Sequence, residues 1–319
     1  MKLSVLIQGP IIAEDDITFK SIQSVRKHFP HSKIILSTWS DHKNLFSKRF
    51  EEISNLVPLF SDDPGAYMVK PNSTLNVNRV IVSSYEGLKK INTEYTLKIR
   101  SDIFFKNNSI LKIFHKFNKI NLKGKFNFTQ ERILFSNQTF LNPNRVPILF
   151  HLCDWLALGK TEDLLDMFDI PLMPKNEFTW FLENKKPEDL LTPGNLSRYM
   201  SEDYIGFKFC HKHFKKLSHK HYYDFSEDDY LNWLEIIKAN FIVIPNKMMG
   251  LYSLKYHNVK DFNLYKSWTY YEWKSLVLSK SNFILKILNT LRVAKYKTFL
   301  FINEILLFIN NLISKLKYK

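Results

Sequence analysis

Cysteine and glycine are both scarce in this chain of 319 residues. Two cysteines, Cys153 and Cys210, are too few for a disulfide framework or a cysteine-rich zinc site, so we expect a reducing compartment. Eight glycines exclude collagen-like and glycine-rich repeats. The sequence also contains no G-x-G-x-x-G and no Walker A motif, which disfavours classical dinucleotide and P-loop nucleotide binding.

Long apolar runs are missing as well. The N-terminal apolar run ends at Gly9-Pro10, well short of the apolar core of a secretory signal peptide. The nearest candidate for a membrane span, residues 305–314, has about half of the ~20 apolar residues that cross a bilayer. The sequence therefore predicts a cytoplasmic protein with neither a signal peptide nor a transmembrane helix.

Acidic residues are nearly absent from the C-terminal end. The chain carries a formal net charge of +15, and about half of this excess lies in residues 274–319, where Glu304 is the lone acid. The remainder is only modestly basic, which disfavours a nucleic-acid-binding surface. Apolar residues recur at helical spacing among the lysines, which predicts a basic amphipathic helical extension over residues 261–319. Such an extension suits an anionic membrane surface or a homo-oligomer interface.

The body of the chain alternates apolar strands with helical segments. Residues 3–7 and 33–38 are predicted strands separated by a helix that ends at His28, which makes a βαβ unit and starts a parallel sheet. Short apolar runs or helical periodicity predict further elements at residues 45–54 (helix), 55–60 (strand), 76–91 (helix), 95–100 (strand) and 201–213 (helix). Residues 1–260 are therefore predicted to form an α/β domain with a Rossmann-like, mostly parallel sheet flanked by helices.

Two polar segments follow predicted interior strands, where ligands of open α/β sheets bind. Gln8-Gly9-Pro10 follows the first strand, and glycine there lets a backbone approach a ligand closely. Arg100 and Asp102 stand at the end of the strand at 95–100. An exposed carboxylate there suits Mg²⁺ or Mn²⁺, and a guanidinium suits a pyrophosphate. Ordinary strand-ending turns would explain both segments as well.

Two adjacent acids open the helix predicted over 201–213, with Ser201 as its expected N-cap. The positive end of a helix favours ionised carboxylates, so Glu202 or Asp203 is available as a general base near neutral pH. The same pattern is also typical of a good cap followed by first-turn acids that have no catalytic role.

Asp154, Trp155 and His257 complete the set of candidate residues. A Trp ring can stack on the apolar face of a hexose while a neighbouring carboxylate accepts hydrogen bonds from its hydroxyls, so Asp154 and Trp155 suit a sugar. A core Trp beside a buried, hydrogen-bonded Asp fits equally. His257 follows the last predicted strand and could share a metal with Asp102, or be a structural histidine.

Seven segments of the chain occur together in an order that resembles one protein family. The segments are LSVLIQGPI, IILSTW, SDDPG, NVNRVIVSSYEGLKKI, YTLKIRSDI, DWLALGKTEDLLDMF and RYMSEDYI. In this order, over about residues 3–257, they resemble the WavE-type lipopolysaccharide-synthesis glycosyltransferases. They also resemble the broader GT-A plan, with a D-x-D-like motif after an interior strand and an x-E-D motif on a later helix.

The resemblance implies a role for each candidate residue. The donor-binding residues would be Gln8, Gly9, Pro10, Asn78, Arg79, Arg100 and Asp102. Glu202 and Asp203 match the x-E-D motif that supplies the base of inverting members. Asp154 and Trp155 would form the sugar-binding or acceptor-binding wall, and His257 would join Asp102 as a metal ligand.

One position departs from the family pattern, because Arg100 stands where the D-x-D motif has its first acid. The implied Mn²⁺ or Mg²⁺ site is therefore either poorer in carboxylates or absent, with Arg100 supplying positive charge to the phosphates, and a CMP-linked donor stays open.

The resemblance implies an inverting glycosyltransferase at the inner face of the plasma membrane. It would move a sugar from a nucleotide sugar to a hydroxyl of a lipopolysaccharide, lipooligosaccharide or capsule glycan, presented as a glycolipid or an oligosaccharide. The first alternative is a sugar nucleotidyltransferase, although QGPIIAEDD lacks the glycine- and lysine-rich phosphate loop usual for that class. The second is a non-catalytic peripheral membrane protein, which would not need acids at strand and helix ends.

Overall fold

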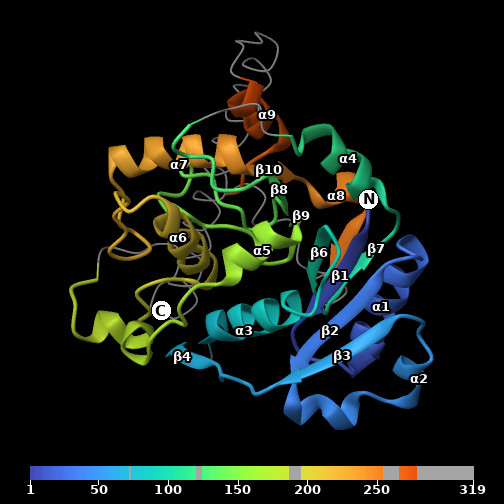
Figure 1. Ribbon diagram of the computed structural model, residues 1–319. Helices are drawn as coiled ribbons and strands as arrows, with labels where there is room; N and C mark the ends of the chain where they lie inside the picture. The colour runs from blue at the N-terminus through green and yellow to red at the C-terminus, as the bar shows by residue number, and fades with distance from the viewer. Residues whose placement is uncertain (72, 120–123, 187–194, 254–265, 279–319) are drawn as a thin grey trace, which may run out of the picture. The chain divides into compact units, whose positions relative to one another are not determined.

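A computed structural model describes residues 1–71, 73–119, 124–186, 195–253 and 266–278 (Figure 1). The chain divides into two compact units, Met1–Thr269 and Tyr270–Lys319. Within the second unit the description covers α9 (Tyr270–Leu278). His257 and most of the predicted C-terminal extension lie outside the described residues. No helix in the described ranges is long and apolar enough to cross a membrane.

A seven-stranded sheet forms the centre of the first unit, and its order is β10-β8-β9-β6-β1-β2-β3. Its strands are β1 (Leu3–Gln8), β2 (Lys33–Trp39), β3 (Leu56–Ser61), β6 (Tyr95–Arg100), β8 (Ile133–Ser136), β9 (Leu156–Lys160) and β10 (Phe241–Ile244). All neighbouring pairs are parallel except those that β9 makes with β6 and β8. The predicted α/β fold with a mostly parallel sheet is confirmed.

Helices cover the sheet because each crossover between parallel strands carries one. The crossovers use α1 (Ile17–His28) between β1 and β2, and α3 (Val77–Leu88) between β3 and β6. α3 packs against β1, β2 and β3, and it contacts α5 (Thr161–Phe168) and α6 (Ser201–His213) on the same face (Figure 1). Gly87 permits this packing, since a Cβ there would lie 2.3 Å from a methyl carbon of Leu6.

The remaining elements border the sheet. α7 (Glu227–Asn240) contacts β10, while β7 (Ile103–Phe105) pairs with β11 (Leu251–Ser253) and β4 (Tyr67–Lys70) with β5 (Ser73–Leu75). The short helices are η1 (Glu14–Asp16), η2 (Ser40–Leu45), α2 (Lys48–Glu51), α4 (Ser109–Phe117), η3 (Lys175–Leu182) and α8 (Asn246–Met249). The helix predicted over 45–54 is thus wrong in extent. α2 buries Phe50 alone, so it has no apolar face that would support a longer helix.

The strand order reverses between β1 and β6. From β1 the chain proceeds outward to β2 and β3, then α3 returns it to the other side of β1, where β6 pairs Arg100 opposite Gln8. The carboxyl ends of these four strands therefore share one edge. β9 runs the other way, so its beginning lies at the same edge, where the Trp155 carbonyl accepts from the Arg100 amide at 3.2 Å. Such a reversal point is where open α/β sheets bind their ligands.

Candidate functional site

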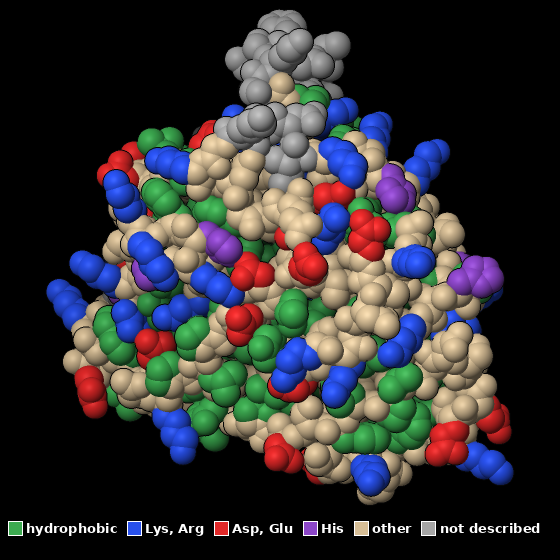
Figure 2. Space-filling view, viewed as in Figure 1, with side chains coloured by type: hydrophobic (Ala, Val, Ile, Leu, Met, Phe, Trp, Pro, Cys, Tyr) green, Lys and Arg blue, Asp and Glu red, His purple; other side chains and the backbone are tan. Residues whose placement is uncertain are grey.

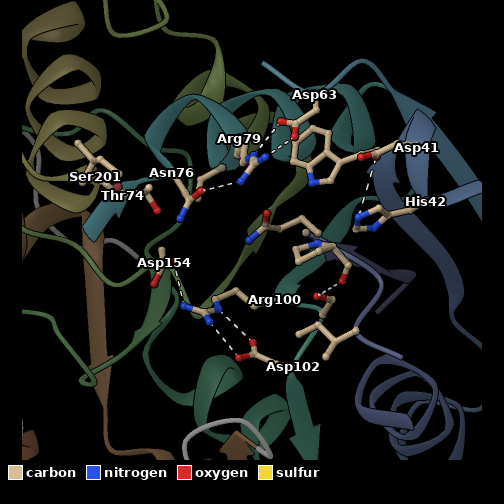
Figure 3. A pocket seen from close by; sticks show the side chains of 18 of the residues that line it. Asp41, His42, Asp63, Thr74, Asn76, Arg79, Arg100, Asp102, Asp154 and Ser201 are labelled. Atoms are coloured by element: carbon tan, nitrogen blue, oxygen red, sulfur yellow. Dashed lines mark hydrogen bonds and ion pairs between the residues drawn. The ribbon is translucent and has the colours of Figure 1, made fainter. Parts of the chain in front are cut away.

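A cavity of about 460 Å³ lies at this edge of the sheet, outside the ends of β1, β2 and β6 and beside the first residues of α3 and α6 (Figure 3). Eight of the candidate residues line it: Gln8, Gly9, Pro10, Arg79, Arg100, Asp102, Asp154 and Glu202. Asn78, Trp155 and Asp203 are not among its lining residues. Residues separated by almost two hundred positions in the chain are therefore brought to one cavity.

The turn after β1 gives the cavity a backbone wall. Gly9 has φ +117°, a conformation that L side chains rarely adopt, and a Cβ there would lie 3.3 Å from the Ser101 hydroxyl. That hydroxyl donates to the Pro10 carbonyl at 2.7 Å, which ties the ends of β1 and β6 together. Gln8 is held from the other side, because the Ser83 hydroxyl donates to its Oε1 at 2.7 Å. The Gln8-Gly9-Pro10 turn is thus fixed by groups on β6 and α3.

Arg100 is the centre of a charged cluster at the end of β6. Its Nε and one terminal nitrogen donate to the two carboxylate oxygens of Asp102 at 3.0 and 2.9 Å, and its other terminal nitrogen lies 3.4 Å from Asp154 (Figure 3). The Ser253 hydroxyl also donates to Asp102 at 3.3 Å. This bidentate geometry orients the guanidinium rigidly toward the cavity.

The same contacts bear on the expected metal site. Asp102 is 2% exposed and both of its oxygens are engaged, so the exposed carboxylate that we expected from the sequence is a buried one. In the part of the chain that the structure describes, no group of three His, Cys, Asp or Glu side chains could hold a metal ion. The donor set built on Arg100 and Asp102 therefore fits a divalent cation poorly, and we assign no chemical step to one.

A second arginine faces the cavity from the first turn of α3. Arg79 donates through Nε to Asp63 at 2.7 Å and through a terminal nitrogen to its other oxygen, and it reaches Asn76 at 3.1 Å. The Arg79 guanidinium holds the pKa of Asp63 below its usual value. Asn78, one residue earlier, has a different task. Its amide exchanges two hydrogen bonds with the Met173 backbone, at 2.7 and 3.0 Å, and anchors that segment.

Several residues of the cavity wall were not predicted from the sequence, among them Trp39, Asp41, His42 and Asp63. Three of them stand at or directly after the end of β2, and Asp63 follows the end of β3. The rule that selected Gln8 and Arg100, the carboxyl end of a parallel strand, would have selected these residues too. The imidazole of His42 accepts from the Ile11 amide through Nδ1 at 2.9 Å, so Nε2 carries the proton of the neutral ring.

Glu202 reaches the cavity from the N-terminus of α6. Its side chain is 21% exposed, and His151 Nε2 lies 3.9 Å from one carboxylate oxygen. Burial, and next the nearby Asp154 carboxylate, raise the pKa of Glu202 to about 8. The helix N-terminus was expected to keep this acid ionised, but burial and like charge outweigh it. Glu202 therefore retains its proton at neutral pH, and together with Asp154 it forms an acid pair in the cavity wall.

Asp203 and Trp155 occupy supporting positions. Asp203 is buried and accepts from the Met200 amide at 2.6 Å, which makes Met200 the N-cap in place of the predicted Ser201. Its other oxygen lies 3.1 Å from Nε2 of the buried His219. Successive residues of a helix point about 100° apart, so Glu202 faces the cavity while Asp203 turns inward. Trp155 places its ring 5.7 Å from the Arg100 guanidinium.

The lining combines two kinds of recognition group. Two guanidiniums and the first turns of two helices offer positive charge and N–H donors, which suit phosphate oxygens. Five carboxyl groups line the same cavity, those of Asp41, Asp63, Asp102, Asp154 and Glu202. Arg79 and Arg100 engage both oxygens of Asp63 and Asp102, which leaves Asp41, Asp154 and Glu202 to form hydrogen bonds with the hydroxyls of a sugar. A ligand that joins phosphate to sugar would use both sets.

Comparison with known proteins decides the family. Residues 3–307 match the family model described as WavE lipopolysaccharide synthesis. The chain belongs to the WavE family. This membership confirms the family resemblance of the sequence segments and gives the protein a role in lipopolysaccharide biosynthesis.

No curated protein matches this WavE protein. Among solved structures, a similar chain is 4-diphosphocytidyl-2C-methyl-D-erythritol synthase from Anaerococcus prevotii DSM 20548, with 12% sequence identity and a TM-score of 0.34. The match covers 66% of the WavE protein and 97% of that chain.

Proposed function

We propose that this WavE protein is a glycosyltransferase that moves a sugar from a nucleotide-sugar donor to a hydroxyl of a lipopolysaccharide, lipooligosaccharide or capsule glycan. The observation that carries the proposal is that a phosphate-binding cation and a proton acceptor lie beside each other in one cavity. Arg100 stands on one side as a phosphate-binding cation, and the Asp154–Glu202 acid pair stands next to it as a proton acceptor. Glycosyl transfer needs both at once, because a phosphate leaves while a hydroxyl loses its proton.

The residues of the cavity wall have separate roles in this reaction. The acceptor hydroxyl attacks the anomeric carbon and forms the new C–O bond, while its proton passes to a carboxylate oxygen of ionised Glu202. The raised pKa of about 8 makes this ionised form more abundant as the pH rises toward 8. The old bond between the anomeric carbon and the phosphate oxygen breaks, and the nucleotide leaves with the electron pair. Arg100 and Arg79, with the N-termini of α3 and α6, stabilise the charge that develops on the phosphate. Attack on the face opposite the leaving group inverts the anomeric configuration.

The test is a donor screen with the purified full-length protein. UDP-, GDP- and CMP-sugars are incubated with an oligosaccharide acceptor, and the released nucleotide is measured. The variant Glu202→Gln should lose ~10²-fold or more in kcat with little change in donor KM, since the base acts mainly in the transition state. Full activity of this variant would contradict the assignment of Glu202.

α5 provides a matched control for that variant. Thr161-Glu162-Asp163 opens α5 as Ser201-Glu202-Asp203 opens α6, but Glu162 bonds to Gln130 and does not line the cavity. Glu162→Gln should therefore keep kcat within about twofold, as expected for a surface change. Formation of pyrophosphate from a nucleoside triphosphate and a sugar phosphate would instead identify a sugar nucleotidyltransferase.

A further inference from the structure

A lysine is buried in the middle of the sheet beneath the cavity. Lys98 lies on β6, its side chain is 1% exposed, and it is not among the residues that line the cavity. Its ammonium donates to the backbone carbonyl of Asp154 at 2.6 Å and lies 5.4 Å from the centre of the Phe168 ring. Lysine is almost never fully buried unless it has a partner, because removing the charge from water is costly. The burial of a lysine at this position in the sheet therefore needs a specific explanation.

The charged groups around Lys98 all belong to the end of the sheet where the cavity lies. Arg100 ends the strand that carries Lys98, Asp102 lies in the turn after it, and Cys153 and Asp154 come from the segment that leads into β9. Burial raises the pKa of the Cys153 thiol to about 12, so that group is neutral. α5 contributes the uncharged ring of Phe168. Asp154 is thus the residue whose backbone carbonyl accepts from Lys98 and whose carboxylate interacts with the Lys98 charge.

Asp154 in turn connects Lys98 to the base. Its carboxylate lies 3.4 Å from Arg100 and, after burial, is the strongest influence on the protonation of Glu202. The charge of Asp203, the next residue of the helix, also raises the pKa of Glu202. His151 lies 3.9 Å from Glu202, and burial lowers the pKa of its imidazole, which is therefore neutral. Arg100 lowers the pKa of Glu202 directly, and Lys98 interacts with Asp154, so among the described residues both are cations that can offset the acid pair.

We propose that Lys98 is a positioning residue for the Asp154–Glu202 pair, which fixes Asp154 through its backbone and supplies a buried positive charge that makes the pair easier to ionise. This inference rests on the proposed function, since it treats Glu202 as the base. It accounts for a lysine at a strand position where an apolar residue would pack. Burial lowers the pKa of Lys98 to about 8, so the native state bears a cost for the charged form that a structural residue would not need.

The experiment compares Lys98→Met with wild-type protein in full-length form. Methionine keeps most of the side-chain volume and removes the charge and the hydrogen bond to Asp154. We expect kcat to fall at least ~10-fold with donor KM within about threefold, because the base and not the donor is affected. We also expect the pH at which activity rises to move upward by about one unit, since loss of a nearby cation makes the pair harder to ionise. The melting temperature should be unchanged or higher.

Arg132 provides the matched control. It is also a buried cation that donates to backbone carbonyls, those of Phe117, Lys119 and Lys238, but it precedes β8 at the opposite edge of the sheet. Arg132→Met should leave the pH profile unmoved, whatever it does to stability.

The outcomes separate the two proposals. Normal kcat and an unmoved pH profile in Lys98→Met would overturn the role of Lys98 while leaving the glycosyltransferase intact. A lowered melting temperature with an unmoved profile would also overturn it, since the lysine would then serve stability alone. No nucleotide release by wild-type protein with any donor and acceptor would overturn the proposed function itself.

Discussion

At the scale of single residues, the sequence predicted which types of side chain form the site better than it predicted which way each side chain points. Glu202 and Asp203 are adjacent acids, and the sequence could not distinguish them because both suit a helix N-terminus. The structure separates them by their partners, since Asp203 is bonded to Met200 and His219 while Glu202 meets the cavity. Asn78 was misplaced for a similar reason, as a helix residue whose neighbour Arg79 faces the site.

The raised pKa of Glu202 predicts a pH dependence of stability. The native state keeps a proton that the unfolded chain releases near pH 4.5, the ordinary value. The resulting stability is complete below about pH 4.5 and is lost as pH rises through about 8. In Glu202→Gln this loss should vanish, so urea unfolding between pH 5 and 8.5 should show a smaller decline than in wild-type protein. An equal decline in both proteins would mean that Glu202 ionises as it does in water.

At the scale of elements, buried strands and their ends were the most predictable part. The strand at 95–100 and the helix at 201–213 match β6 and α6. The cap residue and first-turn acids at 201–203 are typical of a helix start. The carboxyl-end rule then brought Gln8 and Arg100 to one site. It did not predict that Arg100 would donate to both oxygens of the Asp102 carboxylate, since side-chain pairing depends on geometry that strand order alone does not give.

The turn after β1 supplies a second prediction. Gly9→Ala should destabilise the fold by on the order of 1 kcal/mol, because of the positive φ, and should also weaken donor binding by pushing the Ser101 hydroxyl from its bond to Pro10. Gly65→Ala is the control, since Gly65 has φ +82° with nothing within 4 Å of the added Cβ. Thermal unfolding and donor titration measure the two effects. A similar loss of donor affinity in both variants would show that strain alone, and not the cavity wall, is responsible.

At the scale of the whole molecule, the half of the sheet formed by β1, β2 and β3 was predictable from the sequence. The half formed by β8, β9 and β10 was not. β1, β2 and β3 follow one another through short crossovers, whereas β8 pairs with β10, where Ile133 lies opposite Phe241, and with β9. Pairings across a hundred residues leave no local trace in the sequence.

The charge distribution is also a property of the whole molecule. On the face shown in Figure 2, the Lys and Arg side chains of the described residues are interspersed with Asp and Glu.

The last prediction concerns the basic C-terminal extension, which lies largely outside the described residues. Every residue that lines the cavity belongs to the unit Met1–Thr269, so a chain truncated before Ser281 should still transfer sugar to a short soluble acceptor. We propose that the extension binds the anionic inner leaflet, because residues 274–319 carry nine Lys or Arg against Glu304 alone and each basic residue near such a surface contributes about 1 kcal/mol.

The measurement is co-sedimentation with vesicles of phosphatidylglycerol, and with phosphatidylcholine as the uncharged control. Full-length protein should sediment with the anionic vesicles at low salt and much less at high salt, because salt screens charges that lie near the surface. The truncated chain should stay in solution with both lipids. If the two proteins sediment equally, the extension serves packing or homo-oligomerisation instead, and a difference in their oligomeric state would follow. Because the truncated chain retains the whole cavity, this result would leave the assignment of the catalytic residues unchanged.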